Sequence, residues 1–171
     1  GPGLSIEKQS EIVTAYQKDN KPLTVSVNFV PEQMKVDYIF LSNSKRYVQL
    51  ASTLADEHLD FQVIATSNVT KTSGKFDYTL KYSTLLDEDA EVIDNSFIML
   101  LKVMIKLGVG HVALAGFDGY VGDTASNYIN PNMEYHFNAE QAKALNEYVK
   151  ETLKELGKKL DIEFITESLY A

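Results

Sequence analysis

The sequence predicts an α/β fold, a three-layer α/β/α Rossmann-like sandwich with a mostly parallel sheet. Short β-rich segments alternate with helical segments over most of the 171 residues, and this order favours a parallel sheet covered on both faces. The segment from His111 to Phe117 (HVALAGF) is a continuous apolar run, which is typical of a central parallel strand. Together these two observations set the fold class.

Helices are indicated by apolar residues at helical spacing and by residues that cap helix ends. The expected helices are 5–18, 44–55, 96–107 and 139–156. A residue of Ser42-Asn43-Ser44 caps the second, Asp94 or Asn95 caps the third, and Asn138 with Gln141 forms a capping pair for the last. The third helix is apolar on nearly all sides, which predicts deep burial, and Gly108 supplies its left-handed stop.

Strands are indicated by short runs of β-branched and aromatic residues that end at turn residues. The expected strands are Leu23–Phe29, Val36–Leu41, Phe61–Thr66, Phe76–Tyr82, His111–Phe117 and Asp161–Ile165. Apolar and polar residues alternate in Phe76–Tyr82, so this strand is expected at an edge, half exposed. An acidic loop, Asp87-Glu88-Asp89, follows it.

Size and composition restrict the class of protein. Gly1-Pro2-Gly3 resembles the scar of a cleaved expression tag, and residues 4–171 are expected to form a single Rossmann-like domain excised from a longer protein. The absence of cysteine excludes disulfides, thiolate metal sites and a cysteine nucleophile. The net charge of −8 argues against nucleic acid and anionic membranes as partners. The longest apolar segment, 96–107, is too short to span a bilayer, so a soluble, cytoplasmic protein is expected.

Polar residues follow the expected strands, at the end of a parallel sheet where ligands gather. Asn28 follows the first strand, Asn43 the second, Ser67-Asn68 the third, and Gly116 to Asp123 the strand that begins at His111. Amides both donate and accept hydrogen bonds, which suits a neutral polar ligand such as a sugar or a nucleobase. The alternative is that these asparagines cap helices and form turns.

The segment after His111–Phe117 has its own ambiguity. Gly116 and Gly119 bracket Phe117-Asp118, so the backbone can turn sharply or approach a ligand closely. Asp118 either holds this turn or binds the ligand. The spacing is not GxGxxG, and no Walker-type loop occurs, so the common phosphate-binding loops are absent.

One of the three histidines is a candidate general base. His136 lies in an aromatic-flanked loop before the last helix, with Glu134 as a possible orienting carboxylate. The alternative is an exposed histidine without a catalytic role. His58 and His111 are expected at structural or surface positions. The sequence has no HExxH, and the acidic loop is expected to be solvated, so no metal or other cofactor is predicted. It also lacks the GxSxG motif of a serine nucleophile.

Part of the chain resembles bacterial CMP-sialic-acid-dependent sialyltransferases and related pterin-kinase-type domains. The likeness lies in DNSFIMLLKVMIKLGVGHVALAGFDGYVGD (94–123), in Tyr135-His136 and in the helix AEQAKALNEYVK (139–150). It implies that His136 activates an acceptor hydroxyl, that Asn43 contacts a nucleotide, and that Asn95 and Ser96 lie at the donor phosphate.

A second likeness covers nearly the whole chain. PLTVSVNFVPE (22–32), DYIFLSNSKRY (37–47) and DNSFIMLLKVMIKLG (94–108) with its LAGFDGY (114–120) look like the domain C-terminal to the catalytic barrel in HMG-CoA-lyase-like or 4-hydroxy-2-oxovalerate aldolase-like proteins. The resemblance implies a parent protein with a metal-dependent carbon–carbon lyase barrel, which would be a partner of this domain.

Three hypotheses follow. The favoured one is an accessory domain of an aldolase-like protein that binds a small polar ligand (a sugar, a sugar acid or a nucleotide) through Asn28, Asn43, Asn95, Ser96, Gly116, Asp118 and Gly119. The second is a glycosyltransferase-like enzyme that uses a nucleotide-sugar donor and His136 as base. It is disfavoured because VSVNFVPEQ (25–33) has no glycine-rich loop. The third is a purely structural domain, which would show an exposed apolar patch.

Overall fold

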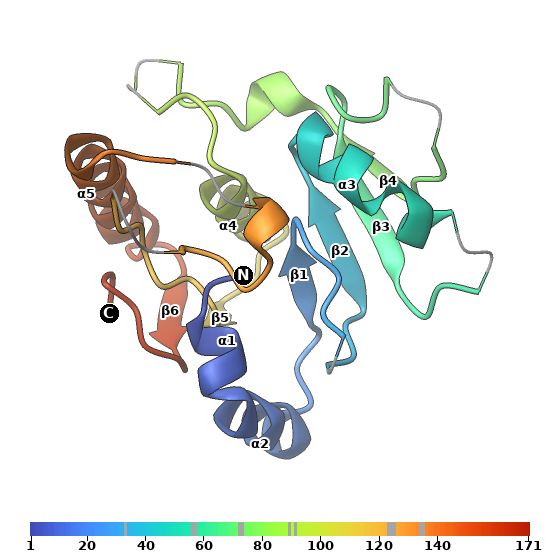
Figure 1. The fold of residues 1–171 in the computed structure, drawn as a ribbon, viewed down its shortest axis with the longest axis horizontal. Coiled ribbons are helices and arrows are strands. Elements are labelled where there is room, and N and C mark those ends of the chain that lie inside the picture. The colour runs from blue at the N-terminus through green and yellow to red at the C-terminus, as the bar shows by residue number, and fades with distance from the viewer. Residues whose placement is uncertain are drawn as a thin grey trace.

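The computed structural model describes residues 1–32, 34–55, 58–71, 74–88, 90, 92–122, 126–133 and 136–171. It confirms the α/β architecture with parallel strands (Figure 1). A four-stranded sheet contains, in spatial order, β1 (Val25–Val27), β2 (Tyr38–Leu41), β3 (Gln62–Thr66) and β4 (Tyr78–Leu80). A second sheet pairs β5 (His111–Leu114) with β6 (Asp161–Phe164). Every pair in both sheets is parallel.

The order of the strands reverses between β1 and β5. Successive strands are added outward from β1 to β4, and the chain then returns so that β5 and β6 lie beyond β1, on the side away from β4 (Figure 1). Side chains pack across this junction, because Phe117 and Met104 each belong to the core clusters of both sheets. The junction is therefore a topological switch point, the place in a parallel α/β fold where a crevice opens at the strand ends.

Three of the five helices that the structure describes begin at the caps that the sequence indicates. The structure contains α1 (Ser5–Lys8), α2 (Ser10–Asn20), α3 (Ser44–Leu54), α4 (Ser96–Lys106) and α5 (Ala139–Leu156), with short 3-10 turns at Tyr82–Thr84 and Pro131–Met133. Asn43 and Asn95 accept backbone hydrogen bonds at the starts of α3 and α4. Asn138 and Gln141 form the predicted capping box, and Gly108 has a φ of +76° after α4. The expected helix 5–18 is divided at Gln9, whose ψ of 27° interrupts the helical backbone.

The helices cover both faces of the strands. On one face Ile39, Leu41 and Val63 pack against Leu54 of α3. On the other face Phe40 packs against Met99 of α4, as expected from the alternation of side chains along a strand.

Helix α4 is buried because it contacts both sheets. Met99, Leu100 and Val103 face the four-stranded sheet. Ile98 and Leu101 pack with β5 and α5. The predicted deep burial of this helix is thus confirmed.

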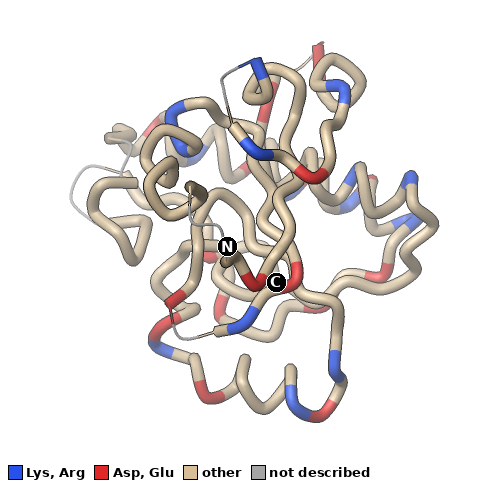
Figure 2. Tube along the Cα trace, turned by 90° about the vertical axis from the view of Figure 1, so that its right-hand side faces the viewer, with Lys and Arg blue, Asp and Glu red and all other residues tan. Residues whose placement is uncertain are grey.

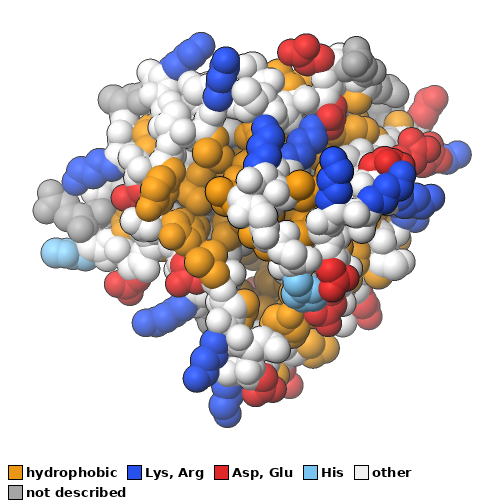
Figure 3. Space-filling model, turned by 180° about the vertical axis from the view of Figure 1, so that it is seen from behind, with side chains coloured by type: hydrophobic (Ala, Val, Ile, Leu, Met, Phe, Trp, Pro, Cys, Tyr) orange, Lys and Arg blue, Asp and Glu red, His pale blue; other side chains and the backbone are white. Residues whose placement is uncertain are grey.

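The edge and the surface follow the sequence pattern. Strand β4 is the last of its sheet, and Tyr78 on it is 49% exposed, as predicted for an edge strand. Charged residues of both signs are spread along the chain (Figure 2), and hydrophobic side chains gather near the centre of the rear face (Figure 3). Within the described ranges, no helix has the length and apolarity needed to cross a membrane.

Candidate functional site

A cavity of about 630 Å³ lies at the carboxyl ends of β1 and β5, at the switch point. Its walls come from the end of β1, the start of α4, the loop after β5, the segment 127–133 and one side of α5. The residues predicted to bind a ligand come from strand ends and from the start of α4, and all of them line this cavity: Asn28, Asn43, Asn95, Ser96, Gly116, Asp118 and Gly119. The structure thus brings them together around one cavity, and their binding of a ligand stays a prediction.

Two of the asparagines have structural roles as well as a place in the cavity wall. The side chain of Asn43 accepts hydrogen bonds from the backbone of Lys45 and Arg46, and that of Asn95 does the same for α4. Asn68 instead donates to the carbonyl of Ser42 and lies outside the cavity lining. For Asn43 and Asn95, the capping interpretation and a place in the crevice are both correct.

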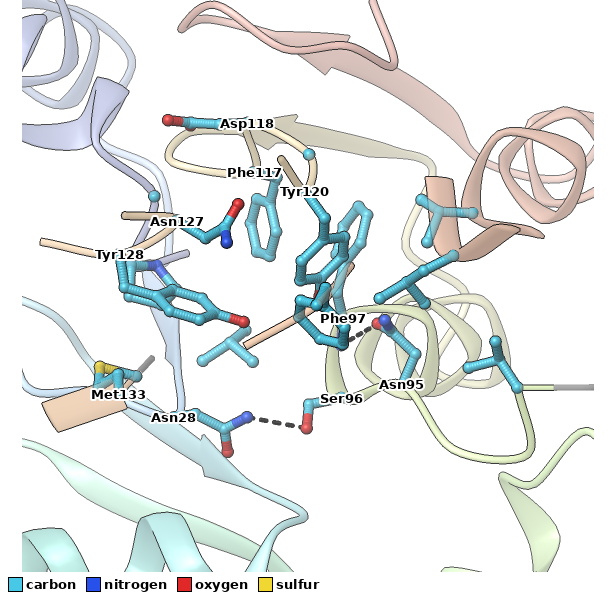
Figure 4. Close-up of a pocket in the computed structure, with 18 of the residues that line it drawn as sticks. Asn28, Asn95, Ser96, Phe97, Phe117, Asp118, Tyr120, Asn127, Tyr128 and Met133 are labelled. Atoms are coloured by element: carbon cyan, nitrogen blue, oxygen red, sulfur yellow. Dashed lines mark hydrogen bonds between the residues drawn. The ribbon is translucent and has the colours of Figure 1, made fainter. Parts of the chain in front are cut away.

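Asn28 in the cavity wall has a strained backbone conformation. Its φ is +61°, in the left-handed region that non-glycine residues rarely adopt. Its Nδ2 donates to Ser96 Oγ at 2.8 Å (Figure 4). Ser96 Oγ also lies 2.6 Å from Ser42 Oγ. The Oδ1 of Asn28 is buried and has no hydrogen-bond partner among the residues that the structure describes. Strained residues and unsatisfied buried acceptors are concentrated at functional sites.

Asp118 holds the N-terminal helix. Its carboxylate accepts hydrogen bonds from the backbone N–H of Ser5 at 2.7 Å and from Ser5 Oγ at 2.5 Å. Ser5 Oγ also bonds to Thr166 Oγ1 at 2.9 Å, and Thr166 Oγ1 accepts from the N–H of Gly116. The carboxylate points away from the aromatic side chains of the cavity (Figure 4). The structure thus gives Asp118 a tethering role, between a segment near the N-terminus and the end of β5.

Both glycines beside Asp118 are required by the backbone. Gly116 and Gly119 have φ values of +68° and +101°. A Cβ on Gly116 would lie 2.2 Å from the carbonyl oxygen of Gly1, and one on Gly119 would lie 2.7 Å from Leu169. Gly3 N–H also donates to the Gly116 carbonyl, so residues 1–3 lie against the end of β5. Their interpretation as a tag remnant stays a prediction.

Aromatic side chains form much of the cavity wall, which sequence reasoning missed. The rings of Phe97 and Phe117 stack with centroids 4.1 Å apart, and Tyr120 meets Phe137 edge-on at 5.3 Å. Tyr128 lies opposite them, with the Arg46 guanidinium 5.5 Å from its ring centre (Figure 4). Only Phe117 and Tyr120 carried a sequence signal, through their place in GFDGY. The others reach the cavity from distant segments.

Two asparagine amides fix the loop that carries Tyr120. Asn146 on α5 accepts from the Tyr120 N–H at 2.9 Å and donates to the Tyr120 carbonyl at 2.8 Å. Asn127 forms the same pair of bonds with Val121, at 2.6 and 3.1 Å. The hydroxyl of Tyr170 donates to Asn146 Oδ1 at 2.7 Å. These bonds fix the position of Tyr120 in the cavity wall.

The charged side chains of the described lining are bonded within the protein. Arg46 is buried and donates to the Met133 carbonyl and to Gln49 Oε1. Asp94 accepts a hydrogen bond from the Tyr82 hydroxyl. Burial raises the pKa of Tyr170, and its neighbours Tyr120 and Asp118 raise that pKa further, which keeps its hydroxyl protonated.

The histidines lie away from the cavity. His136 is exposed and is not part of the cavity lining, whereas the next residue, Phe137, lines the cavity. Glu134, predicted to orient His136, falls outside the described residues, as does Tyr135. His58 is exposed, and His111 contacts Asp161 at 2.8 Å and Glu163 at 3.4 Å at the opposite end of β5 and β6. The catalytic role of His136 stays a prediction.

The described residues contain no group of three or more histidine, aspartate or glutamate side chains that could hold a metal ion. From the acidic loop, Asp87 pairs with Lys102 at 2.5 Å and accepts a hydrogen bond from the Tyr148 hydroxyl at 2.5 Å. Asp89 falls outside the described residues. Asp87 therefore anchors the loop to α4 and α5.

The chain matches no protein-family model, and no curated protein or solved structure matches it significantly.

Proposed function

We propose that this domain binds a small, neutral, ring-containing polar molecule, a sugar or a nucleobase derivative, in the cavity at the switch point, and that it does not transform it. One observation carries the proposal. Polar residues from strand ends and from the start of α4 converge on a single cavity of about 630 Å³ whose remaining walls are aromatic and aliphatic. Ligand sites combine apolar and aromatic walls with a few polar groups in this way, and the volume lies within their usual range of roughly 300–1,000 Å³.

The chemistry of the walls defines the ligand. The faces of Phe117, Tyr120 and Tyr128 can pack against a flat or ring-shaped group. Asn28 and Ser96 supply polar groups at the base of the cavity. A planar ring with polar edges can use both surfaces at once, whereas an aliphatic chain would leave the polar groups without partners.

Binding without turnover is favoured by how the charged groups are used. Asp118 is bonded to Ser5, Asp94 to Tyr82, and Arg46 to the Met133 carbonyl. General acid–base catalysis needs a titratable group within hydrogen-bond reach of the substrate. These side chains instead hold the walls of the cavity.

The resemblance to the C-terminal domain of aldolase-like proteins supplies a setting for this activity. In that setting the domain would be an accessory module beside a carbon–carbon lyase barrel, and it would present a bound molecule rather than cleave it. The fold alone does not assign an activity to a domain, so the binding experiment comes first.

Thermal unfolding with nucleosides, nucleotide sugars, sugar acids and 2-oxo acids tests the proposal. A ligand at 100 times its Kd stabilises the folded state by about 2.7 kcal/mol, which raises the Tm by roughly 5–10 °C for a domain of this size. The protein has no tryptophan, so its intrinsic fluorescence comes from 10 tyrosines, of which Tyr120, Tyr128 and Tyr170 line the cavity. Absence of a shift with every compound would refute a ring-binding cavity.

A matched pair of variants locates the binding. Phe137→Ala removes a ring from the cavity wall, whereas Phe76→Ala removes a ring that pairs with Tyr47 away from it. Both rings belong to pairs with centroids 5.3 Å apart. Loss of this ring is expected to weaken the binding of a nucleobase by roughly 1–3 kcal/mol in Phe137→Ala and to leave it unchanged in Phe76→Ala. Product formed from a nucleotide sugar, and lost in His136→Ala, would instead support the transferase hypothesis.

A further inference from the structure

A second cavity, of about 650 Å³, adjoins the first. Its walls come from α1, the start of α2, the loop after β1, α3 and the segment 129–133. Asn28 and Met133 line both cavities, so these two residues form part of the partition between them. No residue pattern in the sequence indicated this second space.

The second cavity is lined mainly by apolar side chains. They include Ile6, Phe29, Met34, Leu50, Ile129 and Met133. Methionine is unbranched and polarisable, so Met34 and Met133 can adapt to the shape of an apolar group. The first cavity has several aromatic rings in its wall, whereas Phe29 is the one aromatic residue among the described residues of this lining. The lining is therefore suited to an aliphatic group rather than to a stacked ring.

The charge of this lining has one sign. Among the described residues, Glu7 and Glu32 are its charged members, and both are exposed. The first cavity differs because a buried arginine, Arg46, forms part of its wall. The whole chain carries a net charge of −8, which adds to a negative potential at the opening. The two carboxylates and the net charge favour a cation over an anion at this cavity.

We propose that the second cavity binds an alkylammonium group. The aliphatic chain packs against Ile6, Leu50 and the two methionines, and the ammonium lies near Glu7 and Glu32. This cavity and its ligand class differ from those of the proposed function, so neither proposal depends on the other.

Methionine-methyl NMR tests the proposal directly. The chain has 4 methionines: Met34 lines only the second cavity, Met133 lines both, and Met99 and Met104 pack in the core outside both linings. Titration with n-hexylamine at neutral pH is expected to shift the Met34 and Met133 signals saturably and to leave Met99 and Met104 unchanged. Hexanoate, with an equal chain length and opposite charge, is expected to shift none. A Met34 signal that does not respond to hexylamine, or that responds equally to hexanoate, overturns the proposal.

Charge variants separate the site from a general effect of net charge. Glu7→Gln with Glu32→Gln is expected to weaken hexylamine binding by roughly fivefold or more. The control, Glu147→Gln with Glu151→Gln, removes the same charge from exposed positions on α5 that line neither cavity. Its affinity for hexylamine is expected to equal that of the parent. Equal weakening in both variants would assign the attraction to net charge and overturn the site.

Discussion

Replacing Asp118 with alanine should destabilise the fold because it detaches the N-terminal helix from the end of β5. The carboxylate accepts both the N–H and the hydroxyl of Ser5, a residue only 4% exposed. A hydrogen bond to a charged group contributes about 1.5–3 kcal/mol when buried. Because Asp118 is only partly buried, the two bonds together are expected to contribute about 2–3 kcal/mol. The Tm should fall by roughly 4–12 °C.

A double-mutant cycle with Ser5→Ala identifies the contact responsible. Ser5→Ala removes the hydroxyl's bonds to Asp118 and Thr166 but keeps the N–H bond to Asp118, so its cost should be about 1–2 kcal/mol. The two substitutions share a partner, and their combined effect should fall short of the sum by about 1 kcal/mol. Urea unfolding of the four proteins measures these terms. If Asp118→Ala unfolds within about 0.5 kcal/mol of the parent and yet loses ligand binding, the tethering role is refuted and the ligand role predicted from the sequence is restored.

Three further predictions concern the cavity wall and the loop that borders it. Asn28 has a φ of +61°, which glycine tolerates and alanine does not. Both Asn28→Gly and Asn28→Ala lose the side-chain amide, so the free energy of unfolding of Asn28→Gly should be about 1 kcal/mol higher than that of Asn28→Ala. Equal free energies of unfolding would contradict backbone strain at this residue. Burial, a hydrogen bond to Asp94 and the charge of Asp94 raise the pKa of Tyr82 to about 12. The contribution of this hydroxyl to the free energy of unfolding is therefore full below the unfolded pKa of 10.0 and is lost as the pH rises toward 12. In a spectrophotometric titration, Tyr82→Phe should remove one tyrosine that ionises at high pH. At Asp87, burial acts to raise the pKa but hydrogen bonds from Lys102 and Tyr148 outweigh it and hold the pKa below 3.8. The contribution of Asp87 to the free energy of unfolding is present above pH 3.8 and is lost as the pH falls through its lower pKa in the folded state. Lys102→Met should therefore reduce the dependence of the free energy of unfolding on pH in acid. An unchanged pH dependence would count against the ion pair.

The sequence predicted most of the elements because their signals are local. Asn43, Asn95 and Asn138 cap helices through backbone groups two or three residues away. Gly108 ends α4 through its own φ. The carboxyl ends of the strands could also be listed from the sequence, and in a parallel sheet those ends meet on one side. The convergence of Asn28, Asn43 and Gly116 on one cavity was therefore predictable.

The aromatic wall was not predictable in the same way. Tyr128 and Phe137 lie in loops or at loop ends, and no spacing rule relates them to Phe97 on α4. Arg46 gave no signal either, because its burial depends on Tyr128 and on the Met133 carbonyl, 87 residues away. The second cavity went unnoticed for the same reason: its walls come from segments that are far apart in the chain.

By itself, the sequence determined the class of the fold, the type of most helices and strands, the caps of α3, α4 and α5, and the carboxyl end of the sheet as the place of a cavity. These depend on interactions within a few residues, which a local pattern records. Only the tertiary structure decided that Asp118 holds Ser5, that Ser5 meets Thr166 across 161 positions, and that Asn28 has an unpaired buried oxygen. Such contacts arise from the packing of whole elements, and no local pattern specifies which distant side chain an element will meet.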